Sequence, residues 1–541
     1  MVSAWGNHTV GRTSEKSKDA AAGWIWDFAG ILGGYPSGSW IRFFHMKTYD
    51  SLRSHFLQTS YLNKTIALLD WDHETYLPSK GVAFRADQQA FLSGLSHERL
   101  IAPRVGDWIE ACEAETDSLD PFQNANLTAW RRDRDRAVKL PTEFVEAFEK
   151  ECALSKAAWA EARRKSSFDL FSHHLSRLVD MSRQKADYYG YEKNPYDALL
   201  DVYEPGCTSQ DLSPVFSKLK EFIVNLLPDA METTKRITTD FLHGFYPLEG
   251  QKKFNEMVAK ATGFDFGAGR IDATTHPFCT DLGPQDIRLT TRYNELDFTE
   301  SFYSVLHEVG HGLYEQGFIP EHAGTPMAEA VSLGIHESQS RLWENKIGRD
   351  PAFWQDWYDK ACECLPALKK FSPEDLTLAV NRVSPSFIRV EADEVTYDLH
   401  IILRFELEKD LLSGDLKVED VPAAWNERFR SMFGLEVPDD AHGCLQDIHW
   451  SMGGFGYFPT YTLGNLNSAQ LFSAAQKDLG KPAAVLQDGE YAEILAWLRE
   501  KVHCHGRRFE PAELMQTATG QTIQPGHHAR YLEHRFEVLK A

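Results

Sequence analysis

The stretch TESFYSVLHEVGHGLYE, residues 299–315, contains the pattern His-Glu-x-x-His inside a helical repeat. On an α-helix, His307 and His311 project from the same face, one turn apart, because they are four residues apart. Two neutral imidazoles at that spacing can bind one metal ion, usually zinc. Glu308 lies between them, placed to reach a water on the metal rather than the metal itself. The stretch therefore predicts a helix that carries part of a metal site.

The residues around the histidines support a helix. An apolar band runs beside them, formed by Phe302, Val305, Leu306, Val309 and Leu313. Thr299 or Ser301 can cap the start of the helix, and Gly317 can end it. The alternative is an ordinary helix with two surface or core histidines, so the rest of the chain has to supply a third ligand and a substrate site.

Composition limits the classes of function. The chain has 541 residues and a formal net charge of -22. A surface with that much negative charge repels nucleic acid and anionic membranes. It has 8 cysteines, scattered and without a C-x-x-C pair, as is typical of a reducing compartment. No apolar run approaches the roughly 18 residues needed to span a bilayer. We therefore expect a cytoplasmic protein with no nucleic-acid or membrane partner.

The first 45 residues differ from the rest. Residues 1–45 are rich in Gly, Ser, Ala and Trp and lack helical periodicity, whereas an amphipathic helical pattern begins at Met46. We interpret residues 1–45 as a disordered N-terminal extension. Organellar targeting is the alternative, and the acidic residues Glu15, Asp19 and Asp27 count against it.

One segment departs from the helical pattern. Residues 263–294 are rich in Gly, Asp, Thr and Pro, and residues 286–293 alternate in polarity. That alternation predicts a strand, one of very few, directly before the metal helix. An extended peptide can add to a free sheet edge through main-chain hydrogen bonds, so we expect this strand to be an edge strand beside the metal site.

A catalytic zinc needs a third protein ligand and an open position. A helix predicted to begin at Thr325-Pro326 carries Glu329, Glu337 and Glu344. Glu329 and Glu337 are eight residues apart, about 80° around a helix, so geometry does not separate them well. Glu337 lies among polar residues that can orient a ligand, whereas Glu329 is favoured in a first turn by the helix dipole alone. We prefer Glu337 and keep Glu329 as the alternative.

Six separated motifs now support a family resemblance. They are residues 69–78 (LDWDHETYLP), 286–290 (DIRLT), 307–311 (HEVGH), 336–341 (HESQSR), 388–397 (IRVEADEVTY) and 443–450 (GCLQDIHW). Together they resemble the thermostable carboxypeptidase family, often called carboxypeptidase Taq, over residues 46–541. Only the extension, residues 1–45, lies outside the resemblance.

The resemblance implies both a fold and an activity. The expected fold is mainly α: a large helical protein whose two helical halves, within residues 46–541, flank one deep active-site cleft, with a small β-sheet next to the His-Glu-x-x-His helix. The expected activity is a metal-dependent carboxypeptidase that releases single C-terminal amino acids from peptides with broad specificity, commonly as a homodimer. The resemblance implies His307, His311 and Glu337 as ligands and Glu308 as the general base.

Further residues are candidates for the chemistry. By resemblance and residue type, Tyr397 and His449 are candidates to stabilise the tetrahedral intermediate, although each is equally plausible as a packed core residue. A carboxypeptidase must also bind a free carboxylate, which suits an arginine fork. The family motif favours Arg389, with Arg288 on the predicted edge strand second; the other candidates are Arg404 and Arg430. The acidic neighbours of Arg389 suggest a structural ion pair instead.

Two further classes of function remain open. A related oligopeptidase or aminopeptidase has the same metal site, and Asp393-Glu394 could then bind a substrate amine. A non-catalytic scaffold that retains a metal is the other alternative, against which the carboxylate of Glu308 argues. We expect one divalent ion per chain, zinc first, although cobalt or manganese suits the same ligands.

Overall fold

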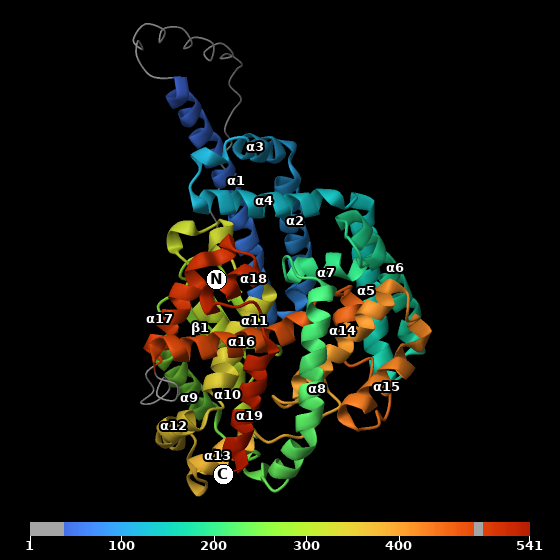
Figure 1. Cartoon of the computed structure of the whole chain (residues 1–541), viewed down its shortest axis with the longest axis vertical. Helices are drawn as coiled ribbons and strands as arrows, with labels where there is room; N and C mark the ends of the chain where they lie inside the picture. Colours follow the sequence, from blue (N-terminus) through green and yellow to red (C-terminus); the bar gives the residue numbers. More distant parts are fainter. Residues whose placement is uncertain (1–36, 481–490, 541) are drawn as a thin grey trace, which may run out of the picture.

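The computed structural model of the protein describes residues 37–480 and 491–540. Within these residues the chain is mainly helical, with one three-stranded sheet, which confirms the predicted fold class (Figure 1). The predicted extension, residues 1–45, falls largely outside the described residues. Helix α1 (Ser37–Thr75) begins ahead of the predicted boundary at Met46. In the described part of the chain, no helix combines the length and apolar character that a membrane span requires.

The N-terminal helices form a paired layer. Helices α1 and α2 (Val82–Ile101) pack against each other, and α3 (Pro103–Glu113) and α4 (Pro121–Lys139) lie across one end of the pair (Figure 1). Helix α4 is joined to both sides of the molecule by ion pairs. Arg136 pairs with Asp201 of helix α7, and Asp133 accepts from Arg507 near the C-terminus at 2.8 Å. These ion pairs connect α4 to helix α7 on one side and to the segment around Arg507 on the other.

Two large hydrophobic cores lie beneath this layer. The first contains residues of α9 (Leu248–Ala261), α10 (Phe298–Glu315), α11 (Leu333–Arg341), α12 (Pro351–Cys364), α13 (Pro373–Val380), α17 (Ala492–Lys501) and α18 (Pro511–Thr519). The second contains residues of α5 (Thr142–Lys165), α6 (Asp169–Tyr189), α7 (Pro195–Tyr203), α8 (Ser209–Thr234), α14 (Tyr397–Ser413), α15 (Val421–Phe433) and α19 (Pro525–Lys540).

Helix α16 (Pro459–Leu479) belongs to both cores. Its first half places Leu463 and Leu466 in the second core, and its second half places Leu471 and Phe472 in the first. It also packs along α11 (Figure 1). One buried helix, packed along α11, therefore connects the two cores.

The sheet lies against α10, but the predicted strand is not at its edge. The order is β1 (Gly269–Ala273), β3 (Ile287–Thr291), β2 (Cys279–Asp281), with β1 parallel and β2 antiparallel to β3. The strand predicted within residues 286–293 is therefore real but central, and the expectation of an edge strand is wrong. Ile287 and Leu289 are buried, and Leu289 lies against Gly312 of α10. Strand β2, which directly precedes β3 in the chain, pairs antiparallel with it on one side, and β1 pairs with it on the other, so neither side of β3 is free.

The caps of the two metal-site helices also differ from expectation. Helix α10 is capped by Asp297, whose carboxylate accepts from the backbone N–H of Thr299 at 2.9 Å. A carboxylate is well suited there because it also faces the positive end of the helix dipole. Helix α11 begins at Leu333 with Ser332 as its cap, and Pro326–Ala328 forms only a short 3₁₀ turn. A helix beginning at Thr325-Pro326 is thus wrong.

Close approach of α10 and α11 depends on Gly310. A β-carbon at this position would lie 2.4 Å from the backbone oxygen of Gln339 and 2.5 Å from the Cα of Ser340. Both obstacles are backbone atoms, which cannot move aside as a flexible side chain can. Any larger residue at position 310 would therefore separate the two helices.

We predict that Gly310→Ala lowers the free energy of unfolding by about 1–3 kcal/mol, the usual cost of overpacking, and weakens metal binding. Thermal unfolding and the metal content of the purified protein measure the two effects. Gly94→Ala is the matched control, because Gly94 lies in α2 and a β-carbon added there would have no atom within 4 Å. There alanine should be neutral or slightly stabilising. Equal stability of the two variants would contradict the packing argument.

Candidate metal centre

Three side chains from α10 and α11 converge on one point. The Nε2 atoms of His307 and His311 are 3.2 Å apart, and the Oε2 atom of Glu337 lies 3.6 Å and 3.5 Å from them. In a tetrahedral zinc site with bonds of about 2.1 Å, ligand atoms are separated by about 3.4 Å. Within residues 37–480 and 491–540, these three residues form the group of His, Cys, Asp and Glu side chains that could hold a metal ion. The residues present therefore fit a tetrahedral divalent ion.

Each ligand is held by a second partner. His307 Nδ1 lies 2.9 Å from Glu344 Oε2, and His311 Nδ1 lies 3.1 Å from the backbone oxygen of His336. These contacts leave both Nε2 atoms facing the common point. Glu337 accepts from Arg341 Nε at 2.7 Å through its other oxygen. The ring of His336 also stacks on that of His311, with centroids 4.2 Å apart.

The ligands are buried, so their charges depend on one another. Burial by itself would raise the pKa of Glu337, but Arg341 and His307 hold it well below its usual range. Burial lowers the pKa of His311 to about 3, which keeps this imidazole neutral at neutral pH. Glu337 is therefore an anion and His311 a neutral base, the protonation states that a metal ligand requires. By contrast, and against the effect of burial, Glu337 and Glu344 raise the pKa of His307 to about 9, so this imidazole has to release a proton when an ion binds.

The three glutamates that the sequence offered as possible third ligands occupy different positions in the structure. Glu337 joins the histidines, Glu344 orients His307, and Glu329 does neither. The backbone of Glu329 is extended, with φ -132 and ψ 152, and its carboxylate pairs with Arg507 at 2.9 Å. Glu344 lies in a π-helical segment, Leu342–Ile347, that follows α11 directly. Sequence spacing could not separate these residues because it assumed one continuous helix from Thr325.

Glu308 has the environment of a general base. Its side chain is 6% exposed, and burial raises the pKa of its carboxyl group to about 7. Among the described residues its carboxylate makes no hydrogen bond, in contrast to Glu337 and Glu344. The carboxylate is therefore free to take a proton from a water near the three ligand atoms.

Arg389 lies in a buried cluster that continues from the metal ligands. Arg341, the partner of Glu337, lies over the ring of Tyr397 at 4.7 Å, and the hydroxyl of Tyr397 accepts from Arg389 Nη1 at 3.0 Å. Arg389 and Arg404 share one carboxylate, that of Asp447, with Arg389 Nη2 2.8 Å from Asp447 Oδ1. Two guanidinium groups around one carboxylate leave a net positive charge in this cluster.

His449 lies at the same cluster. Burial lowers the pKa of His449 to about 4, and its ring is therefore neutral at neutral pH. Its Nε2 lies 3.3 Å from the hydroxyl of Tyr461, and its Nδ1 has no hydrogen-bond partner within the described part of the chain. The structure thus brings Tyr397, His449 and Arg389 together.

Sequence reasoning missed two tyrosines. The ring of Tyr461 lies 5.0 Å from the guanidinium of Arg389, and Tyr457 contacts both Tyr461 and His449 through its ring. Burial is the largest cause that raises the pKa of both hydroxyls, and the charge of Glu337 adds to it. Both stay protonated at neutral pH. Their closeness to His449 in the sequence was the only signal available.

Arg288 and the acidic pair take other roles. Arg288 binds Asp286 with both contacts at 2.9 Å and lies over the ring of Trp71 at 4.2 Å, on the face of the sheet away from α10. Asp393 accepts from the backbone N–H groups of Val395 and Thr396, and Glu394 pairs with Lys346 at 2.9 Å. The residues that an aminopeptidase site would use are therefore already bound within the chain.

Comparison with known proteins agrees with this geometry. Residues 51–536 match the family described as Carboxypeptidase Taq (M32) metallopeptidase. Thermostable carboxypeptidase 1 of Thermus thermophilus is 42% identical over 502 residues, which cover 91% of this chain and 98% of that protein. Carboxypeptidase 1 of Bacillus subtilis is 38% identical over 481 residues, covering 89% of this chain and 96% of that protein.

Solved structures show the same similarity. The M32 carboxypeptidase from Deinococcus radiodurans superposes with a TM-score of 0.89 at 39% identity, covering 92% of this chain and all of the other at 100%. Metallocarboxypeptidase 1 of Trypanosoma cruzi superposes with a TM-score of 0.88 at 36% identity, covering 91% and 99%. The similarity extends over nearly the whole of each relative.

We predict that Glu344→Gln weakens metal affinity about 10–100-fold, because His307 loses the carboxylate that orients its ring. Competition with a chelator of known affinity measures the change. Glu329→Gln is the matched control, since Glu329 was the alternative ligand but binds Arg507 instead. Its metal affinity should equal that of the unmodified protein. A larger loss in Glu329→Gln than in Glu344→Gln would contradict this description of the site.

Proposed function

The chain belongs to the carboxypeptidase Taq (M32) family of metallopeptidases, and from that premise we propose how its own residues perform the hydrolysis. It is a metallocarboxypeptidase. The proposal rests on one observation: three possible ligand atoms converge beside the buried carboxylate of Glu308, which makes no hydrogen bond among the described residues. We propose that the enzyme releases single C-terminal amino acids from peptides with broad specificity.

His307, His311 and Glu337 are the proposed ligands of one divalent ion per chain. Two nitrogen ligands and one carboxylate at tetrahedral spacing support zinc as that ion, with cobalt or manganese as substitutes. When bound, the ion supplies a Lewis acid that polarises the scissile carbonyl and acidifies a water. Metal analysis of the purified enzyme tests this assignment.

Glu308 is the proposed general base and then general acid. Its carboxylate takes the proton of the attacking water and delivers it to the amine of the departing amino acid. A pKa near 7 suits both steps, because the group can accept and release a proton at neutral pH. The non-catalytic scaffold becomes the weaker interpretation, since a structural metal needs no such group.

Tyr397 and His449 are the proposed donors to the developing oxyanion. Tyr397 donates its own proton while its oxygen accepts from Arg389. The neutral ring of His449 donates through whichever nitrogen carries its proton. Donors fixed in a buried site stabilise an oxyanion more strongly than water does.

Arg389 is the proposed anchor for the substrate carboxylate. It is 7% exposed, and together with Arg404 it carries more positive charge than Asp447 neutralises. An incoming carboxylate supplies the missing negative charge and pairs with the guanidinium. This anchor is what restricts hydrolysis to the last peptide bond.

We also propose a cytoplasmic homodimer. The eight cysteines are all free, which supports a reducing compartment. Phe84 and Phe91 of α2 are 70% and 67% exposed, which supports an interface between copies. Light scattering that gives the mass of a single 61.5 kDa chain would exclude the dimer.

We predict that Glu308→Gln retains metal but lowers kcat by about 10²–10⁴-fold, the usual contribution of a positioned acid–base group. Mass spectrometry of a digested peptide and metal analysis give the two readouts. Glu300→Gln is the control on the same helix, since Glu300 lies near its start and pairs with Arg292. The mechanism is wrong if the Glu308→Gln variant binds metal and hydrolyses peptides at the unmodified rate.

We predict that Arg389→Ala lowers kcat/KM for peptides with a free C-terminus by about 10²–10³-fold, because the carboxylate loses its charged partner. C-terminally amidated peptides, which carry no carboxylate, should lose far less. Arg288→Ala is the control, because Arg288 is held by Asp286 and Trp71. Equal losses on free and amidated peptides would remove Arg389 from this role.

A further inference from the structure

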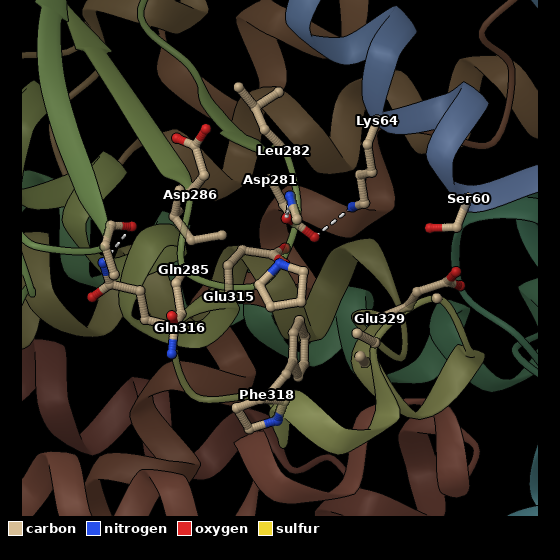
Figure 2. A pocket seen from close by; sticks show the side chains of 18 of the residues that line it. Ser60, Lys64, Asp281, Leu282, Gln285, Asp286, Glu315, Gln316, Phe318 and Glu329 are labelled. Atoms are coloured by element: carbon tan, nitrogen blue, oxygen red, sulfur yellow. Dashed lines mark hydrogen bonds and ion pairs between the residues drawn. The ribbon is translucent and has the colours of Figure 1, made fainter. Parts of the chain in front are cut away.

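A cavity of about 560 Å³ lies between α1, the end of α10 and the turn that joins β2 to β3. Figure 2 shows Lys64 of α1 reaching across it to Asp281 of β2, with a contact of 2.5 Å, and Glu315, Gln316 and Phe318 on another side. None of the residues assigned above to metal binding or catalysis lines it.

Two elements run from the catalytic residues into this cavity. Helix α10 places Glu315 in the cavity wall one turn beyond His311, and Glu315 binds His336, which stacks on His311. Strand β2 begins at Cys279, close enough to Glu308 to feel its charge, and ends at Asp281 in the cavity wall. The two elements that flank the candidate metal ligands thus also contribute to the cavity wall.

The cavity lies on the side of the metal ligands opposite to Arg389. Along α10 the order is His307, His311, Glu315. At the His307 end, Glu344 and Arg341 lead to Tyr397 and Arg389. At the Glu315 end lies the cavity. A peptide whose carboxylate is bound at Arg389 and whose last peptide bond lies at Glu308 is thus directed into the cavity by its preceding residues.

Strand β2 gives that peptide a main-chain partner. The sheet ends at β2, because β2 pairs with β3 on one side only. The opposite wall is the face of α1 formed by Leu57, Tyr61, Lys64 and Leu68, at helical spacing. Lys64 of this wall is bonded to Asp281, so α1 touches β2 at that point, and an extended segment that adds to the free edge of β2 through main-chain hydrogen bonds has to lie beside this contact.

The wall is mainly apolar. It includes Leu57, Leu68, Leu282, Pro284, Phe318 and Ile319. On α1, Tyr61 is 61% and Leu68 is 40% exposed, which leaves apolar surface facing the cavity without a partner in the described part of the chain. An apolar side chain that enters would remove this surface from water.

The charges in the wall disfavour an acidic occupant. It contains five acidic residues, Asp265, Asp281, Asp286, Glu315 and Glu329, against the basic residues Lys64 and Arg499. Asp281 is paired with Lys64, and Glu315 with His336. Asp286 and Glu329 are paired as well, with Arg288 and Arg507 outside the wall, so the lining has only a small excess of negative charge, which disfavours a further carboxylate.

We propose that this cavity binds the part of a peptide substrate on the amino-terminal side of the scissile bond, and that it selects an apolar side chain two or three residues before that bond. The inference rests on the proposed function, since Arg389 and Glu308 set the direction of the peptide. The cavity then supplies affinity for longer peptides that the carboxylate anchor alone cannot supply.

The test compares N-acetylated peptides that all end in Ala-Phe and release phenylalanine. Acetyl-Leu-Leu-Ala-Phe, acetyl-Gly-Gly-Ala-Phe and acetyl-Glu-Glu-Ala-Phe reach the cavity, whereas acetyl-Ala-Phe ends before it. We expect the Leu-Leu peptide to have a KM at least about tenfold below that of the Gly-Gly peptide, from burial of apolar surface. The Glu-Glu peptide should have the highest KM of the three. Equal KM values for the Leu-Leu and Gly-Gly peptides would overturn the proposal.

A cavity-filling variant tests the location. Ser60→Trp places an indole in the cavity from α1 and should remove the advantage of the Leu-Leu peptide while leaving acetyl-Ala-Phe unchanged. Thr65→Trp, which also places its side chain in the cavity lining from α1, gives the same test if Ser60→Trp does not fold. Ser54→Trp is the matched control, because Ser54 lies on α1 outside this cavity and should keep the advantage. A folded filling variant that still prefers the Leu-Leu peptide tenfold would overturn the proposal.

The short peptide separates failure of the cavity proposal from failure of the proposed function. If the unmodified, metal-loaded enzyme hydrolyses acetyl-Ala-Phe but shows no preference among the longer peptides, the cavity proposal alone fails. If acetyl-Ala-Phe is not hydrolysed and Glu308→Gln behaves like the unmodified enzyme on all substrates, the proposed function fails as well.

Discussion

The close contact between α10 and α11 is the constraint on which the site depends. Gly310 of α10 allows the backbone of α11 to lie close to α10. On the other side of α11, Gly464 of α16 leaves space for the side chain of Glu337, because a β-carbon at position 464 would lie 2.4 Å from the Cγ of Glu337. The absence of side chains at these two positions thus allows α10 and α16 to lie close to α11, which brings Glu337 near the two histidines. The result is a set of ligand atoms already at tetrahedral spacing, so little reorganisation is needed when an ion binds.

The second constraint is electrostatic. Glu337, Glu344, Arg341 and His307 are mutually paired, which is how so many ionisable groups can be buried together. Asp447 with Arg389 and Arg404 forms a second paired group, joined to the first through Tyr397. The first group has space for a cation between its side chains. The second group has two guanidinium charges against one carboxylate, which leaves one positive charge without a partner in the group. Under the proposed function, a peptide with a free C-terminus would place its scissile carbonyl at the first group and its carboxylate at the second.

Much of this could be predicted from the sequence, because the decisive signals are local. Helical periodicity located α10, and the polar neighbours of Glu337 favoured it over Glu329 as the third ligand. Non-local facts were out of reach. The strand order places β3 between β1 and β2, and no alternation pattern within one strand reveals its neighbours. Arg389 is bound by a residue 58 positions away, and not by its acidic neighbours in the sequence. The start of α11 was misplaced because Thr325-Pro326 is a good cap signal for a segment that becomes a 3₁₀ turn.

In the proposed arrangement, the substrate site extends from Arg389, past the candidate metal ligands, to the apolar cavity beyond Glu315. In this arrangement His307, His311 and Glu337 bind one ion together, while the carboxylate of Glu308 does not bind it. Anomalous diffraction from crystals of the zinc-loaded enzyme, recorded on both sides of the zinc absorption edge, tests this claim most directly. We expect one peak per chain at about 2.1 Å from both Nε2 atoms and from Glu337, with Glu308 outside bonding distance. A peak bound by Glu308, or one that excludes Glu337, would contradict it.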